Sequence, residues 1–431
     1  MPSAMIDQPH NGVTKFTNCR LVRGDALVPG DLWVSAVTGK VIHSQSSFYD
    51  ECLVPNEVVD LGGRIVSPGL IDVQLNGAYG FNFSTMPEDP TEYARQVREL
   101  NRQLVRTGVT AYMPTLTSQK PELYRMVLPF LGPSGHLQTA QDGSESLGAH
   151  VEGPFISPTK NGAHNPSVFR EAHSFRDLEE CYGAKNITPR ASGEPIPIRK
   201  LTAAPEIGAM TSLIPEVRAR GIVFAMGHSE ATYEEASAAT AAGCTMITHL
   251  FNAMRPLHHR NPGIFGVLGH ADGRDRPYFG IIADGIHLHP TTTRIALNAH
   301  PEGLILVTDA MHLVGLPDGA YQWSNGSNVS HIVKKGPKLV LEGSDTIAGS
   351  SITLLECVNN LMEWTGASIP QALKTVTETP AAMLSLEGVK GTLDPGADAD
   401  LVVFSEETTE AGAPRLVVDE VWKFGARVWK N

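Results

Sequence analysis

Short apolar runs alternate with helix-like segments through the middle of this chain of 431 residues. Eight runs are apolar and end in small or polar residues: SPGLIDVQLNG, VTAYMPT, LGAHVEG, KLTAAPE, IVFAMGH, TMITHL, YFGIIADG and LILVTDA. Runs of this length and composition are typical of parallel strands that are buried on both faces. The pattern therefore predicts eight parallel strands.

Helical periodicity lies between these runs. Apolar residues at positions 93, 97, 100 and 104 recur at helical spacing, and Gly108 ends that segment. A second helix is predicted after GHS, where residues 232–235 have a capping-box pattern and Gly243 provides a stop. Eight strands with helices between them favour a (β/α)₈ barrel, whose catalytic groups lie at the C-terminal strand ends. A doubly wound open sheet is the competing topology, but it would gather polar residues at one crevice.

The two ends of the chain follow a different pattern. From Phe16 to Val66, and again from about Gly388, short β-like pieces are broken by Gly, Pro and Asp. We therefore predict a small discontinuous β-sandwich domain from residues 1–67 and 387–431, and the barrel from residues 68–386.

Two insertions interrupt the barrel pattern. Residues 157–199 are rich in Pro, Gly, Asn and His and are predicted as a long loop, with a short helix near SFRDLEECYG. Residues 318–343 are predicted as a β-hairpin after the eighth strand.

Three metal-type side chains stand at the ends of three predicted strands: Glu152, His228 and His249. If the strands are parallel neighbours, these groups meet at one end of the barrel. Two neutral imidazoles and a carboxylate suit Zn²⁺ or a similar divalent ion, and three ligands leave a position for water. A single buried histidine more often bonds to the backbone, and a lone glutamate can cap a helix. The prediction of a metal site therefore depends on all three residues together.

Further polar residues end the first and last predicted strands. Asp309 either caps the following turn or, beside a metal ion, takes a proton from water and returns it to a leaving amine. Gln74 and Asn76 end the first strand, where a second ion would need ligands, but amides are poorer ligands than imidazole. Their alternative role is to hydrogen-bond the loop backbone. We therefore predict one strong metal position.

Several loops carry groups that could bind a substrate. His164 and His287 could polarise a carbonyl or hold an anionic oxygen, and each could equally have only a local partner. The backbone of Asn252 and Ala253, together with Arg260, suits a phosphate, although a solvated basic loop is the alternative.

The TIAGSS segment, which contains Ala348 and Gly349, is predicted as a loop that opens a helix. Such a loop either lets a ligand approach the backbone or only caps the helix.

Charge and cysteine content narrow the class of protein. A net charge of −12 argues against a nucleic-acid or anionic-membrane partner, but not against a small anionic substrate. The sequence has no apolar stretch long enough to span a bilayer and no secretory pattern at its start. Five scattered cysteines without CxxC spacing fit reduced thiols, so we expect a cytoplasmic protein.

The motifs, taken in order, resemble a known family. PGLIDVQLNG, HVEGPF, KNGAHNP, GHSEAT, THLFNAMRPLHHRNPG, ADGIH, VTDAM and IAGS are similar to those of the N-acetylglucosamine-6-phosphate deacetylases of the amidohydrolase superfamily. The resemblance covers essentially the whole chain. Compared with shorter bacterial-type patterns, this chain has a longer loop over residues 170–199 and the hairpin near Gln322.

The resemblance implies specific roles. It implies that Glu152, His228 and His249 bind the metal and that Asp309 is the catalytic acid and base. We expect His164, as a second catalytic residue, to polarise the acetamide carbonyl together with the metal. It also implies contacts to the sugar phosphate from Ala163, His164, Asn252, Ala253, Arg260, His287, Ile347, Ala348 and Gly349. In this family the equivalent of Arg260 can serve a neighbouring subunit, which implies a homodimer. Gln74 and Asn76 match the branch that carries one metal.

The expected reaction is metal-dependent hydrolysis of N-acetyl-D-glucosamine 6-phosphate to D-glucosamine 6-phosphate and acetate, in amino-sugar catabolism or recycling. One divalent ion per subunit is expected, with Zn²⁺ as the first candidate, although Fe²⁺, Mn²⁺ and Co²⁺ accept similar ligands. Two alternatives are an amidohydrolase acting on a cyclic amide or an N-acyl amino acid, and a non-catalytic scaffold that keeps the barrel.

Overall fold

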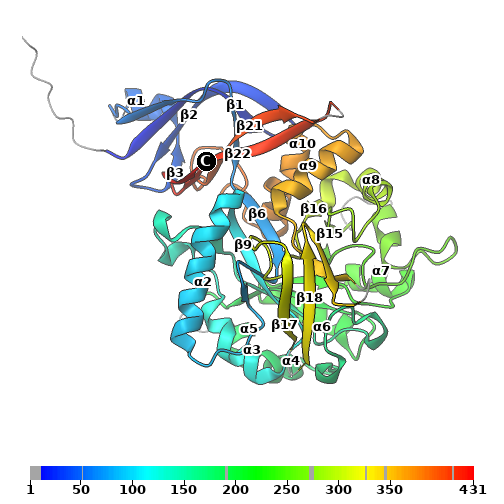
Figure 1. Cartoon of the computed structure of the whole chain (residues 1–431). Helices are drawn as coiled ribbons and strands as arrows, with labels where there is room; N and C mark the ends of the chain where they lie inside the picture. The colour runs from blue at the N-terminus through cyan, green and yellow to red at the C-terminus, as the bar shows by residue number, and fades with distance from the viewer. Residues whose placement is uncertain are drawn as a thin grey trace, which may run out of the picture.

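The computed structural model describes residues 11–50, 52–189, 193–270, 276–325, 328–343, 347–409 and 412–431. Residues 1–10 of the predicted terminal domain and residues 190–192 of the predicted long loop lie outside this description. In Figure 1 the blue N-terminal strands and the red C-terminal strands lie together in one layer, beside a larger α/β body. No helix in the described ranges is long and apolar enough to cross a membrane.

The α/β body is a ring of eight parallel strands. In spatial order they are β6 (Leu70–Leu75), β9 (Val109–Leu116), β11 (Ala149–Glu152), β12 (Ile198–Ala203), β13 (Val223–Met226), β14 (Met246–Ile247), β15 (Tyr278–Ile281) and β16 (Leu304–Leu306). Every residue of β6 and β9 is buried, as expected for strands covered on both faces. The backbone N–H of Asp309 donates to the carbonyl of Gln74 at 2.9 Å, which nearly closes the ring between its last and first strands. The prediction of a (β/α)₈ barrel is confirmed.

Helices surround this ring (Figure 1). The predicted apolar stripe is buried along α2 (Pro90–Leu104), and Gly108 has a φ of +86° where that segment ends. Thr232 caps α7 (Tyr233–Ala241) with the predicted capping box. The helices are α1 (Ser44–Tyr49), α2 (Pro90–Leu104), α3 (Pro121–Val127), α4 (Phe175–Tyr182), α5 (Ala184–Ile187), α6 (Met210–Ala219), α7 (Tyr233–Ala241), α8 (Pro290–Ala299), α9 (Leu354–Thr365), α10 (Ile369–Lys374) and α11 (Glu378–Met383). Helix α4 is the short helix predicted within the long loop.

The chain ends form one sheet with the order β23-β22-β21-β5-β1-β2-β3, and β4 pairs with β1. Phe16 of β1 and Trp422 of β22 are not on neighbouring strands, yet their ring centroids lie 4.8 Å apart. The sheet therefore curls around a core of its own. Its strands are β1 (Val13–Arg23), β2 (Ala26–Ser35), β3 (Lys40–Ile42), β4 (Glu57–Asp60), β5 (Ile65–Pro68), β21 (Leu401–Thr408), β22 (Pro414–Lys423) and β23 (Ala426–Lys430). We keep 1–67 with 387–431, against 68–386, as the proposed domain division.

A buried ion cluster joins this sheet to the barrel. Lys423 lies 2.5 Å from Glu145 and 2.7 Å from Asp400, and its side chain is fully buried. Lys390 pairs with the same two carboxylates and with Asp398. Glu145 belongs to β10 (Glu145–Ser146), which pairs with barrel strand β9, whereas the other residues belong to the C-terminal part of the chain.

The insertion after β16 is larger than the predicted hairpin. Strands β17 (Gly319–Asn325) and β18 (Asn328–Lys335) do form a hairpin, but β19 (Lys338–Leu341) and β20 (Ile347–Ser350) extend it to four antiparallel strands. The prediction of residues 347–349 as a loop opening a helix is wrong, because they form β20, and α9 begins only after its N-cap Thr353. Pairing with β19 satisfies the backbone groups that a loop would leave to water, and sequence spacing does not reveal that partner.

Candidate active site

A cavity of about 260 Å³ opens at the C-terminal ends of the barrel strands. The side chains that project into it stand on strained backbone. His228, His249 and Asp309 have φ values of +49°, +26° and +47°, a region that residues other than glycine rarely adopt. Such strain persists only where the surrounding structure enforces it, and it is concentrated at functional sites. Here each strained residue lies two or three residues beyond the C-terminal end of a barrel strand.

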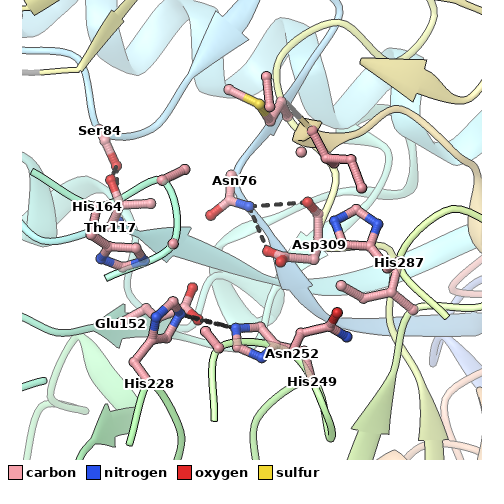
Figure 2. Close-up of a pocket in the computed structure, with 18 of the residues that line it drawn as sticks. Asn76, Ser84, Thr117, Glu152, His164, His228, His249, Asn252, His287 and Asp309 are labelled. Carbon is pink, nitrogen blue, oxygen red and sulfur yellow. Dashed lines mark hydrogen bonds and ion pairs between the residues drawn. The ribbon is translucent and has the colours of Figure 1, made fainter. Parts of the chain in front are cut away.

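The predicted ligand trio converges in this cavity (Figure 2). Nε2 of His228 lies 3.2 Å from Oε1 of Glu152, and Nε2 of His249 lies 3.0 Å from that same oxygen. The two ring nitrogens are 3.0 Å apart. All three side chains are almost fully buried. Burial alone would raise the pKa of Glu152, but hydrogen bonds and charge from the two imidazoles hold it well below its usual range.

The donor chemistry of this trio fits a cation. Nδ1 of His228 lies 2.7 Å from the carbonyl oxygen of Lys160, which can only accept, so Nδ1 carries the hydrogen. In a neutral ring Nε2 then presents a lone pair to the lone pairs of Glu152. A point equidistant from the three atoms lies about 1.8 Å from each, close to the roughly 2.0 Å of a Zn–N bond. Nδ1 of His249 is buried without a partner among the described residues.

Asp309 faces this trio across the cavity and is held by two amides. Nδ2 of Asn76 donates to its Oδ1 at 2.7 Å, and Nε2 of Gln74 donates to the same oxygen at 3.2 Å. Gln74 also donates to both carboxylate oxygens of Glu152 at 3.2 Å. Burial and the negative charge of Glu152 raise the pKa of Asp309. The two amides therefore hold the carboxylates in place through their N–H groups. The alternative prediction, that Gln74 and Asn76 only hydrogen-bond the loop backbone, is wrong.

Two further histidines line the cavity. Oγ of Ser118 lies 2.8 Å from Nδ1 of His164, and burial lowers the pKa of His164 to about 3. His287 makes a 2.7 Å contact from Nδ1 to Asp284. Burial would raise the pKa of Asp284, but the hydrogen bond and charge of His287 lower it. Each histidine thus has a local partner and also presents an edge to the cavity.

The predicted phosphate-binding residues separate into two groups. Asn252 and Ala253 line the cavity, and Nδ2 of Asn252 is buried without a partner in the described part of the chain. Ala163 and the three β20 residues 347–349 also line it. Arg260 does not, because it lies on an exposed loop where its guanidinium contacts His259 at 2.9 Å. Within one chain the structure does not bring Arg260 to the other site residues.

Sequence reasoning missed several residues of the cavity wall. Asn82, Ser84 and Thr117 supply polar groups to the cavity wall, and Met311, His312 and Trp323 come from the segment after β16. His312 is buried, its Nδ1 has no partner among the described residues, and burial lowers its pKa to about 4. The sequence signal was present in VTDAMH, because His312 follows Asp309 by three residues, but no pattern indicated that the insertion folds back over the barrel.

The fold and the site together define a class of hydrolase. The sequence profile of the amidohydrolase family matches residues 65–428, so the chain belongs to the amidohydrolase family. Several of the proteins similar to this chain are N-acetylglucosamine-6-phosphate deacetylases. The N-acetylglucosamine-6-phosphate deacetylase of Mus musculus is 39% identical over 425 residues, which cover 95% of this chain and 96% of the relative.

Two more distant proteins agree with this placement. The N-acetylgalactosamine-6-phosphate deacetylase of Escherichia coli O157:H7 is 29% identical, with 86% of this chain and 89% of that protein covered. A mutant N-acetyl-D-glucosamine-6-phosphate deacetylase from Mycobacterium smegmatis, solved in complex with N-acetyl-D-glucosamine-6-phosphate, is 26% identical with a TM-score of 0.74. That match covers 96% of this chain and 98% of the solved one. The matches confirm the resemblance seen in the motifs.

Proposed function

We propose that this protein hydrolyses N-acetyl-D-glucosamine 6-phosphate to D-glucosamine 6-phosphate and acetate. The observation that carries the proposal is the meeting, in one cavity, of Glu152, His228 and His249 with a separate buried carboxylate at Asp309. The deacetylase relatives support the choice of substrate. Because deacetylation needs both an activated water and a proton for the leaving amine, this pairing of groups suits it.

Each residue of the site has its own role in the proposed reaction. Glu152, His228 and His249 would hold one divalent cation, which when bound supplies Lewis-acid polarisation and acidifies water. Asp309 takes the proton of the attacking water, because its raised pKa makes it a stronger base than an exposed aspartate, and it then delivers that proton to the more basic departing nitrogen. His164 donates to the acyl oxygen as negative charge develops there. His287 and Nδ2 of Asn252, which has no partner among the described residues, bind oxygen atoms of the substrate and orient the amide bond.

We propose one metal position per subunit, with Zn²⁺ as its first candidate. Support comes from Gln74 and Asn76, which direct N–H groups, and not their amide oxygens, at Glu152 and Asp309. Elemental analysis of purified protein should find one transition metal per chain. Two per chain would contradict the assignment.

Asp309→Asn tests the catalytic role. The asparagine oxygen can still accept from Asn76 and Gln74, so the fold and the metal content should persist. Loss of the proton acceptor should lower kcat by about 10²–10⁴-fold, the usual contribution of general acid–base catalysis. Acetate release from the phosphorylated sugar measures kcat, with the unphosphorylated sugar as the specificity control. Full activity of the variant would rule out this role for Asp309.

We also propose a homodimer in which Arg260 completes the partner's site, since Arg260 is exposed and lies outside the cavity of its own chain. Arg260→Ala and Asp309→Asn proteins, each nearly inactive, are mixed under conditions that exchange subunits. A mixed dimer then holds one site with both groups intact, so activity should return. If subunits exchange but activity does not return, then Arg260 and Asp309 belong to the same site, or Arg260 has no role in catalysis.

The epimeric sugar is the second candidate substrate, because one relative acts on N-acetylgalactosamine 6-phosphate according to its name. The two sugars differ at one ring hydroxyl, so comparing kcat/KM for both decides between them. A cyclic amide or an N-acyl amino acid lacks the phosphate, so higher kcat/KM on either of those would reject the proposal. The five free cysteines suit the reducing cytoplasm, which we propose as the compartment.

A further inference from the structure

Ser118 makes an unusual double contact with His164. The backbone N–H of Ser118 donates to Nδ1 of His164 at 3.1 Å, and its hydroxyl oxygen lies 2.8 Å from the same nitrogen. A backbone N–H can only donate, so Nδ1 must accept through its lone pair. The hydrogen of a neutral imidazole then resides on Nε2.

This tautomer decides between two possible roles of His164. One ring nitrogen of His164 lies within 4.8 Å of ligand atoms of Glu152 and His228, so proximity alone would allow His164 to bind the metal. A ligating nitrogen needs a free lone pair, however, and Nδ1 is occupied by Ser118 while Nε2 carries a hydrogen. Nε2 has no hydrogen-bond partner among the residues that the structure describes, and His164 lines the cavity. Its N–H is therefore available to a substrate.

The chain makes room for this contact at Gly153, the residue after Glu152. A Cβ atom at that position would lie 2.2 Å from Oγ of Ser118, and Gly153 has a φ of +77°. Any other residue would therefore displace the Ser118 hydroxyl. The glycine of the HVEGPF motif thus permits the hydrogen bond between Ser118 and His164.

We infer that Ser118 is a positioning residue that holds His164 in the Nε2–H tautomer, so that the ring donates to the substrate's acyl oxygen and does not ligate the metal. The inference deepens the proposed function and depends on it for the identity of the acceptor. When water attacks the acyl carbon, the C=O π bond opens and its electron pair moves to oxygen. An N–H donor already aimed at that oxygen stabilises the charge, an effect typically of about 10²–10³-fold in kcat.

Substitution of His164 by glutamine and by asparagine tests whether Nε2 of His164 donates a hydrogen bond to the substrate or binds the metal. The glutamine amide nitrogen reaches the position of Nε2, whereas the asparagine amide reaches only the position of Nδ1. If Nε2 is a donor, His164→Gln should keep about 10-fold more kcat than His164→Asn, and both should retain the full metal content of the wild type. Loss of metal in either variant, or equal loss of kcat in both, would overturn the inference.

Ser118 itself is tested with a matched control. Ser118→Ala keeps the backbone donor, so kcat should fall only about 2- to 10-fold with KM nearly unchanged, and Ser118→Cys should recover part of the loss. Ser146→Ala removes another buried hydroxyl, which donates to the carbonyl of Leu131 at 2.9 Å and does not line the active-site cavity, and it should leave kcat unchanged. Equal losses in Ser118→Ala and Ser146→Ala would mean that Ser118 acts only through general stability.

A spectroscopic measurement reads the tautomer directly. In ¹⁵N-histidine-labelled metal-loaded protein, the His164 signal is assigned by its absence in His164→Gln. Its Nε2 should be protonated and its Nδ1 bare, and a protonated Nδ1 would refute the inference. Because this readout needs no turnover, it still decides the tautomer if the wild type fails to release acetate, an outcome that would defeat only the proposed function.

Discussion

Lys423→Met should destabilise the protein strongly, because it removes one cation from the buried cluster between the terminal sheet and the barrel. Methionine keeps much of the side chain's length but has no charge. Lys423 is fully buried, and its Nζ lies 2.5 Å from Glu145 and 2.7 Å from Asp400. The cluster holds three lysines and three carboxylates when Lys40, which pairs with Asp398 at 2.5 Å, is included.

The magnitude follows from the burial of the carboxylates that remain. Glu145 and Asp400 have side chains only 5–6% exposed, so neither can regain its hydration when Lys423 is lost. Breaking a buried ion pair by deleting one partner costs about 3–5 kcal/mol, since the other charge is left uncompensated. Asp400 shows how strong the compensation is. Burial would raise its pKa, but Lys390 and Lys423 bring it down to about 2.

Urea unfolding followed by tryptophan fluorescence measures the loss, with the double variant Lys423→Met/Glu145→Gln as the control. Removing both charges restores the balance, so the double variant should recover a large part of the lost stability and yield a coupling energy of about 1–3 kcal/mol. A single-variant loss below about 1 kcal/mol, or no recovery in the double variant, would refute the claim that charge compensation joins the two parts of the chain.

Three other outcomes follow from local geometry. Asp72 is buried and its pKa is raised to about 7, so between pH 4 and 7 the folded state holds a proton that the unfolded chain has lost. The free energy of unfolding should therefore fall by up to about 4 kcal/mol as the pH rises from 4 to 7. Urea titrations at several pH values measure this slope, and Asp72→Asn should abolish it. Gly349 has a φ of +123°, and in Gly349→Ala the new Cβ would lie 2.5 Å from the sulfur of Met311, so KM should rise several-fold. The control is Gly343→Ala, which is also at positive φ but in open space, and it should leave KM unchanged in the same acetate assay. Metal affinity should weaken as pH falls, because the imidazole and carboxylate ligands must be deprotonated; competition titrations that show pH-independent affinity would contradict this ligand set.

Much of the fold was predictable because its signals are local. Each barrel strand is a short apolar run, since both of its faces are covered, and each helix of the predicted pair carries its own cap or stop. The trio of Glu152, His228 and His249 could be proposed because parallel strands bring their C-terminal ends to one side of the ring. Those inferences needed only the order of the elements along the chain.

Other features depended on contacts between distant segments. The segment 347–349 belongs to a strand because β19 pairs with it, and nothing within IAGS itself indicates that partner. The cavity wall gained Trp323 and His312 because the insertion folds over the barrel mouth, a placement that composition does not encode.

By itself the sequence determined the barrel, the sheet of joined termini, the family and the set of residues available for metal-dependent hydrolysis. Only the tertiary structure decided how those residues are arranged. In it, the amides of Gln74 and Asn76 donate to carboxylates, and Ser118 donates a hydrogen bond to His164. Arg260 lies outside the cavity of its own chain. The physical reason is that hydrophobic periodicity indicates which face of a segment is buried, and that pattern can be read within the segment itself. The direction of a hydrogen bond depends instead on which groups from distant segments come within about 3 Å of each other.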